Sequence, residues 1–101
     1  MEIIKINEDD FKKEVLNSKE KVLVDFNADW CGPCKMLHAT LEEMEDADYK
    51  VVSVNVDDNE NLSREYGVMS IPCLIVFKDG KEVSRSIGFK TALEIEEMIG
   101  E

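Results

Sequence analysis

The chain has 101 residues, with 23 acidic and 12 basic side chains and a formal net charge of −11 at pH 7. This length is typical of one compact domain, and a hydrophobic content of 44% excludes a disordered chain. The acidic balance argues against nucleic acids and anionic membranes as partners, because both attract clustered Lys and Arg. Three cysteines are too few for a scaffold held together by disulfides.

No stretch of the sequence has the roughly 20 apolar residues that a membrane-spanning helix needs. The first six residues are too few and too charged to form the apolar region of a signal peptide. We therefore expect a cytoplasmic protein whose thiols are kept mostly reduced.

The first third of the chain predicts a strand, a helix and a second strand. Residues 3–6 are rich in β-branched side chains, which favours a strand. Asn7 is a typical N-cap, and Phe11 and Val15 lie four residues apart, on one face of the helix that would follow. Residues 22–26 are almost continuously apolar, as in a strand that is covered on both faces.

The middle of the chain predicts a helix and a further buried strand. Pro33 marks the start of the helix, since proline is favoured in the first turn. The apolar residues that then recur with helical spacing are Met36, Leu37, Leu41 and Met44. Residues 51–56 predict the strand, which completes a βαβ unit with a right-handed crossover.

The last part predicts a short helix, a hairpin and a final helix. Asn59 or a neighbour caps the short helix, and Gly67 ends it. Asp79-Gly80 is a strong hairpin signal between strands at residues 74–77 and 83–87. A capping box over residues 91–94 then opens a helix that buries Ile95, Met98 and Ile99.

The predicted element order is β-α-β-α-β-α-β-β-α. This order indicates an α/β fold in which a mixed central sheet has helices on both faces. No linker or repeat divides the sequence, so residues 1–101 are predicted to form a single domain.

The motif Trp30-Cys31-Gly32-Pro33-Cys34 lies between a buried strand and a helix. Two cysteines one helical turn apart can close a disulfide without large backbone movement. Cys31 lies where unpaired N–H groups and the helix dipole favour a thiolate, so we expect it to be the attacking sulfur. Cys34 is placed to attack the resulting mixed disulfide.

Residues 25–35 resemble the active-site segment of the thioredoxin family, and residues 66–72 resemble its second landmark, which contains a cis Ile-Pro bond. The turn at residues 77–80 and Gly88 also match the family. The resemblance implies the thioredoxin fold over nearly the whole chain. It also implies a thiol–disulfide oxidoreductase that reduces protein disulfides through the Cys31–Cys34 couple.

The resemblance implies a role for Asp25 as the proton acceptor for Cys34. The neighbouring residues support this role, because a carboxyl group flanked by Val24 and Phe26 is expected to be desolvated, with a raised pKa.

The resemblance also outlines a substrate groove. Pro72 would be the cis-proline beside the cysteines, and the backbone of Ile71 would pair with an extended client segment. Trp30 would either dock clients or cover the end of the helix. The remaining wall of the groove would be formed by Ile87, Gly88 and Phe89.

For the reaction as a whole, the family implies that no cofactor is bound and that a thioredoxin reductase supplies the electrons. The expected partners are protein disulfide substrates and this reductase, with the chain acting as a monomer.

Two residues near the motif depart from the family pattern. Asn27 stands where a second Trp is usual, and Ser53 stands where a Lys usually pairs with the buried carboxylate. Without that cation, the pKa of Asp25 is predicted to be higher than is usual in the family. Ala39, where a proline is frequent, predicts a straighter helix, and Phe89 would narrow the groove.

Other functions are also compatible with the cysteines. A zinc site could use Cys31, Cys34, His38 and Cys73, but structural zinc often has a second closely spaced ligand pair, and Trp30 and Pro33 fit redox chemistry better. We therefore assign no metal site, and we interpret Cys73 as a small buried hydrophobic residue whose role stays open. A dedicated partner-docking module and a glutaredoxin-like protein are the alternatives to a general reductant.

The negative charge is unevenly distributed along the chain. Residues 68–77 carry no charge, whereas acids gather in residues 42–48, 57–65 and 94–101. The sequence thus predicts a nearly neutral docking face on an otherwise acidic, soluble protein.

Overall fold

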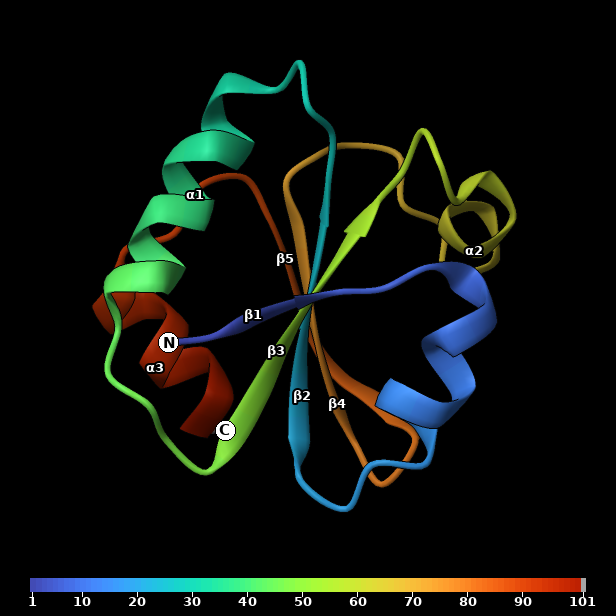
Figure 1. Ribbon diagram of the computed structural model, residues 1–101. Helices are drawn as coiled ribbons and strands as arrows, with labels where there is room; N and C mark the ends of the chain where they lie inside the picture. The colour runs from blue at the N-terminus through green and yellow to red at the C-terminus, as the bar shows by residue number, and fades with distance from the viewer. Residues whose placement is uncertain (101) are drawn as a thin grey trace.

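A computed structural model describes residues 1–100 and contains a five-stranded sheet in the order β1-β3-β2-β4-β5 (Figure 1). The strands β1, β2 and β3 are parallel, whereas β4 runs antiparallel to both β2 and β5. The predicted mixed α/β sheet is therefore confirmed. The strands are β1 (Ile3–Lys5), β2 (Lys21–Asn27), β3 (Tyr49–Asn55), β4 (Cys73–Lys78) and β5 (Lys81–Ile87).

Helices cover both faces of the sheet. The helices α1 (Gly32–Glu43) and α3 (Ala92–Gly100) lie on one face, and α2 (Glu60–Glu65) lies on the other together with the helical turns near the N-terminus (Figure 1). No helix in residues 1–100 is long and apolar enough to cross a membrane.

The first predicted helix is correct in position but not in type. The chain forms a 3-10 turn, Glu8–Asp10, followed by a π-helical segment, Lys12–Leu16. Phe11 and Val15 are both buried against the sheet, as their spacing predicted. A segment this short gains little from helix propensity, so the packing of these two side chains determines its backbone.

The central strand β2 separates two hydrophobic cores. Val24 and Phe26 belong to the core beneath the N-terminal turns and α2, whereas Leu23 belongs to the core beneath α1 and α3. Residues 22–26 are all fully buried, as predicted for a strand covered on both faces.

Met36 corrects the prediction for the apolar face of α1. Leu37, Leu41 and Met44 are buried, but 60% of Met36 is exposed. Met36 immediately precedes Leu37 and so points about 100° away from it around the helix axis.

The predicted ends of the helices are mostly confirmed. The Glu94 N–H donates to the Thr91 hydroxyl at 3.2 Å, and the Thr91 N–H donates to the Glu94 carboxylate at 3.0 Å, which completes the capping box. Asn59 precedes α2, but its side chain accepts from the Glu8 N–H and donates to the Asn55 carbonyl instead of capping the helix. Glu101, in the last acidic run, lies outside the described residues.

The hairpin between β4 and β5 depends on a glycine. Asp79 and Gly80 have φ angles of 51° and 78°, so both occupy the left-handed region. A Cβ on Gly80 would also lie 2.9 Å from the backbone oxygen of Leu16. The turn therefore packs directly against the end of the N-terminal helical segment.

We expect Gly80→Ala to destabilise the protein by more than about 1 kcal/mol, because the new Cβ meets backbone and φ is positive. Urea unfolding measures this difference. Gly100→Ala is the matched control, since nothing lies within 4 Å of its Cβ position and its φ is not positive. Equal unfolding midpoints for the two variants would contradict the prediction.

Candidate active site

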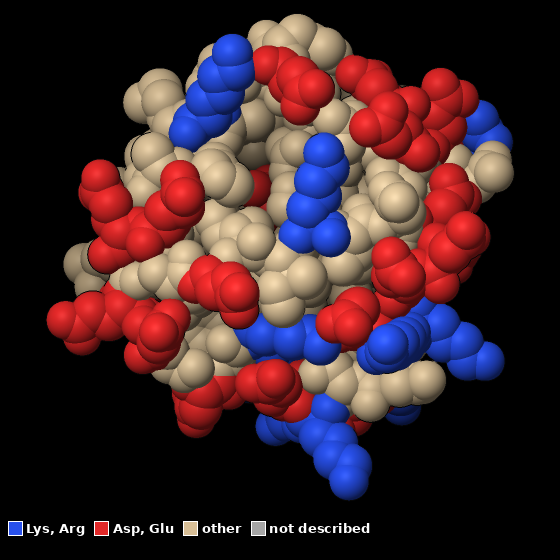
Figure 2. Space-filling view, viewed as in Figure 1, with Lys and Arg blue, Asp and Glu red and all other residues tan. Residues whose placement is uncertain are grey.

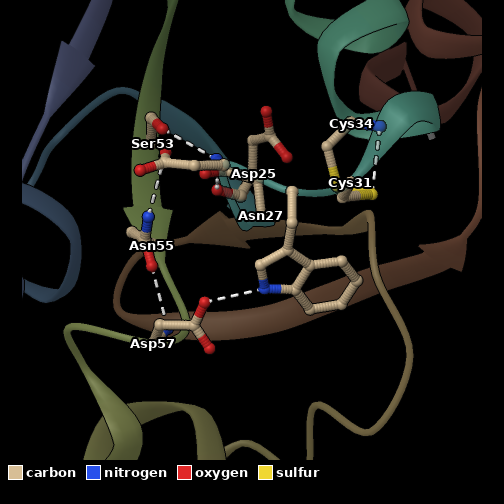
Figure 3. Close-up of a disulfide and its surroundings, with 9 residues drawn as sticks. Asp25, Asn27, Cys31, Cys34, Ser53, Asn55 and Asp57 are labelled. Carbon is tan, nitrogen blue, oxygen red and sulfur yellow. Dashed lines mark hydrogen bonds between the residues drawn. A yellow bond between two sulfur atoms is a disulfide. The ribbon is translucent and has the colours of Figure 1, made fainter.

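Cys31 and Cys34 form a disulfide at the start of α1 (Figure 3). Their Cα atoms are 5.2 Å apart, within the usual range for a disulfide. Cys31 is the N-cap of the helix, and its Sγ accepts a hydrogen bond from the Cys34 N–H at 3.2 Å. An N–H group and the positive end of a helix both stabilise negative charge on this sulfur.

Backbone hydrogen bonds stabilise the cysteine loop and the strand ends from which it begins. The Cys31 N–H donates to the Ala28 carbonyl at 3.2 Å, and the Val56 N–H donates to the Asn27 carbonyl at 2.8 Å. Pro33 occupies the first turn of α1, as predicted, and Gly32 is its first residue. The motif therefore places both sulfurs at the carboxyl ends of β2 and β3.

Asp25 lies in β2, with Ser53 of β3 and Leu74 of β4 opposite it in register. Its side chain is fully buried, and neither carboxylate oxygen has a hydrogen-bond partner among residues 1–100. Burial raises the pKa of Asp25 from 3.8 to about 7. The predicted desolvation of this carboxyl group is thus confirmed, and the comparison with other family members stays a prediction.

The amide of Asn27 lies beside this carboxyl group and opposes part of the rise in its pKa. The amide donates its own hydrogen bonds elsewhere, to the Asp25 backbone carbonyl at 3.0 Å and to the Ser53 hydroxyl at 2.8 Å (Figure 3). Burial is therefore the dominant influence on Asp25. Asn27 and Ser53, two of the residues that depart from the family pattern, are thus hydrogen-bonded to each other.

Trp30 is fixed by residues that the sequence did not single out. Its Nε1–H donates to Asp57 at 2.9 Å, and the Asp57 N–H donates to the Asn55 side chain at 2.8 Å (Figure 3). The amide of Asn55 also donates to Asp29 in the cysteine loop at 3.3 Å. The sequence could have indicated these residues, because Asn55 and Asp57 stand at the carboxyl end of a predicted buried strand. In a parallel sheet this end lies next to the carboxyl end of β2, where the cysteine loop begins.

Ile71 lies beside the cysteines, and Pro72 and Gly88 adjoin it. The Ile71–Pro72 peptide bond is cis, as the resemblance implies. Ile71 packs against Cys31 and Cys34, and the Gly88 N–H donates to the Pro72 carbonyl at 2.8 Å. Three segments far apart in the sequence are thus linked, from the disulfide through Ile71 and Pro72 to Gly88.

Several large apolar side chains on these segments are exposed to solvent. Trp30 is 71% exposed and Met69 is 94% exposed. The others are Met36, Ile87 and Phe89. Exposed apolar side chains that flank the cysteines, the cis-proline and Gly88 in the sequence are typical of a surface that binds other proteins.

The residues of the alternative zinc site are not brought together. Cys73 is a buried free thiol on β4, whose pKa is raised by burial, and His38 lies 3.4 Å from Glu42 on the surface of α1. Within residues 1–100, no group of three or more His, Cys, Asp or Glu side chains is arranged to hold a metal ion.

Comparisons with known proteins agree with this geometry. The family model Thioredoxin matches residues 2–101. The Thioredoxin of Bacillus subtilis (strain 168) is 43% identical over 102 aligned positions, which cover 98% of this chain and 96% of that protein. The Thioredoxin of Staphylococcus aureus (strain MW2) is 43% identical, with coverage of 98% and 96%. That of Griffithsia pacifica is 45% identical, with coverage of 87% and 84%.

The buried Asp25 predicts that the oxidised protein loses stability as the pH rises. The folded protein keeps the Asp25 proton up to about pH 7, whereas the unfolded chain releases it near pH 3.8. The free energy of unfolding therefore falls as the pH rises between these two values. The total decrease in the free energy of unfolding is on the order of 4 kcal/mol. We expect Asp25→Asn to remove this part of the pH dependence in urea unfolding from pH 4 to 8.

Asp46→Asn, which removes an exposed carboxylate, controls for the change in net charge. Parallel pH profiles for Asp25→Asn and the parent protein would show that Asp25 does not retain its proton.

Proposed function

Since this chain belongs to the thioredoxin family and is a thiol–disulfide oxidoreductase that reduces protein disulfides, we propose that Cys31 is its attacking sulfur, Cys34 its resolving sulfur and Asp25 its proton acceptor. The observation that carries this assignment is the hydrogen bond from the Cys34 N–H to the Cys31 sulfur at the helix start. That position favours a thiolate on Cys31 in the reduced protein.

In the first step, the Cys31 thiolate attacks one sulfur of a client disulfide. The client S–S bond breaks, one client thiolate leaves, and a mixed disulfide joins Cys31 to the client. An extended client segment beside Ile71 and the cis Pro72 would hold its disulfide in line with Cys31.

In the second step, Cys34 gives its thiol proton to Asp25 and attacks the sulfur of Cys31. The mixed disulfide breaks, the second client thiolate leaves, and the Cys31–Cys34 disulfide forms. Two electrons have then passed from the dithiol to the client. Asp25 suits this step because a carboxyl group with a pKa of about 7 exchanges protons readily near neutral pH.

Recycling needs a reductant that delivers two electrons to the Cys31–Cys34 disulfide. We assign this role to a thioredoxin reductase, which requires no cofactor bound to this chain. A cytoplasmic setting fits this role, because reduced thiols persist there. We further propose that the protein acts as a monomer and does not bind nucleic acid, given its net charge of −11.

Substitutions of the two cysteines are expected to block different steps of the reaction. In an insulin reduction assay, Cys31→Ser and Cys34→Ser should both abolish turnover, but only Cys34→Ser should accumulate a mixed disulfide with the client. Non-reducing gels and mass spectrometry detect that species. Cys73→Ser is the control, since Cys73 is a buried free thiol outside the Cys31–Cys34 pair, and this variant should keep its turnover.

Accumulation of the mixed disulfide in Cys31→Ser instead would reverse the two roles. The range of proteins captured by Cys34→Ser also separates a general reductant, with many clients, from a dedicated module with one.

A further inference from the structure

A bulge in the edge strand β5 brings Glu82 and Arg85 to the same face of the sheet. Residues three apart in a regular strand point to opposite faces. Here the pairing of β4 with β5 shifts register at Val83, which is an extra residue on β5. Glu82 therefore lies opposite Phe77, and Arg85 lies opposite Ile75. Both of these β4 residues belong to the core beneath the N-terminal turns and α2.

The Arg85 guanidinium joins β5 to the end of α2. Its Nε–H and Nη2–H groups donate to the two oxygens of the Glu82 carboxylate, each at 2.9 Å. The Nη2 group also donates to the Tyr66 backbone carbonyl at 2.6 Å. This carbonyl lies at the C-terminus of α2, where carbonyl groups lack partners within the helix and a cation is favourable. Glu82 thus fixes the guanidinium in the orientation that reaches Tyr66.

The chain leads directly from Tyr66 into the substrate groove. Residues 67–71, here called the docking segment, connect Tyr66 to the cis Pro72. Ile71 packs against the cysteines, whereas Met69 is almost fully exposed. A segment this exposed gains little order from the core, so its position depends on how its ends are held.

The strand β5 and the residue that follows it hold both ends of the docking segment. Arg85 binds the carbonyl of Tyr66 before the segment, and the Gly88 N–H binds the carbonyl of Pro72 after it at 2.8 Å. The Tyr66 ring also packs edge-on against Phe77, with 5.4 Å between the ring centroids. This ring contact fixes the side chain of Tyr66, and Arg85 fixes its backbone, at the point where the docking segment starts.

We propose that Arg85 is a positioning residue for client recognition, which holds the docking segment in the form that pairs with an extended client segment. This inference rests on the proposed docking of clients beside Ile71 and Pro72. A segment that is held in its binding conformation before the client arrives loses less conformational freedom on binding, so the client binds more tightly. Arg85 acts through the backbone of Tyr66 and not through the sulfurs.

A comparison of two substrates tests this role. Insulin has a polypeptide backbone that can pair with the docking segment, whereas dithiobis(nitrobenzoic acid) is a small disulfide without one. With dithiothreitol as the recycling reductant, Arg85→Gln should raise the KM for insulin about 5-fold and leave kcat nearly unchanged. The reduced variant should cleave the small disulfide as fast as the parent protein does.

Net charge has to be separated from this effect, because acidic side chains are spread over the surface seen in Figure 2. Arg85→Gln makes the protein more negative, and Glu82→Gln makes it less negative. Both disrupt the arrangement that reaches Tyr66, so both should raise the KM for insulin. The double variant should raise it no further than Arg85→Gln alone, since the two residues act through one contact. Lys81→Gln, which removes an exposed cation from the same strand, is the matched control and should keep the KM of the parent protein.

Hydrogen exchange measures the order of the docking segment without a client. Arg85→Gln should speed amide exchange in residues 67–71 by about 5-fold or more, whereas exchange in the cysteine loop should stay unchanged. Circular dichroism confirms that each variant is folded. Unchanged exchange in residues 67–71 would overturn the inference.

A further variant tests the docking role on which the inference rests. Ile71→Ala should also raise the KM for insulin, because the Ile71 side chain packs against the cysteines and holds its backbone there. If neither Ile71→Ala nor Arg85→Gln changes this KM, docking beside Ile71 fails and the inference fails with it. If Ile71→Ala raises the KM and Arg85→Gln does not, or if Arg85→Gln slows both substrates equally, only the role of Arg85 is overturned.

Discussion

The structure depends on the complete enclosure of β2. This strand is hydrogen-bonded to β3 on one edge and to β4 on the other, and hydrophobic cores cover both of its faces. Its carboxyl end is therefore fixed, and the cysteine loop begins there. The same enclosure keeps water from Asp25 and raises its pKa, so one strand determines both the position of the sulfurs and the chemistry of their proton acceptor.

Features that were predictable from the sequence are encoded by neighbouring residues. The apolar run of β2, the Asp79-Gly80 turn and the Thr91–Glu94 capping box each act within a few residues of the chain. Cys31 and Cys34 belong to the same class, because their spacing alone places both sulfurs at a helix start. Burial of Asp25 followed from its immediate apolar neighbours.

Features that escaped prediction depend on contacts between distant segments. The hydrogen bond from Trp30 to Asp57 joins residues 27 positions apart, and that between Asn27 and Ser53 joins residues 26 positions apart. The sequence marked Asn27 and Ser53 as unusual separately, but not as hydrogen-bonded neighbours. The type of the N-terminal helical segment and the exposure of Met36 were also not predicted from the sequence. In both cases tertiary packing, and not the spacing of apolar residues, determines the outcome.

The hydrogen bond that fixes Trp30 has an optical consequence. Trp30 is the only tryptophan of the chain, it directly precedes Cys31, and its indole ring is held by Asp57. All intrinsic tryptophan fluorescence therefore arises at the reacting centre. Opening the disulfide, or covering the ring with a client, changes the surroundings of this single fluorophore. The protein carries a built-in optical reporter of its own redox cycle, with no background from other tryptophans.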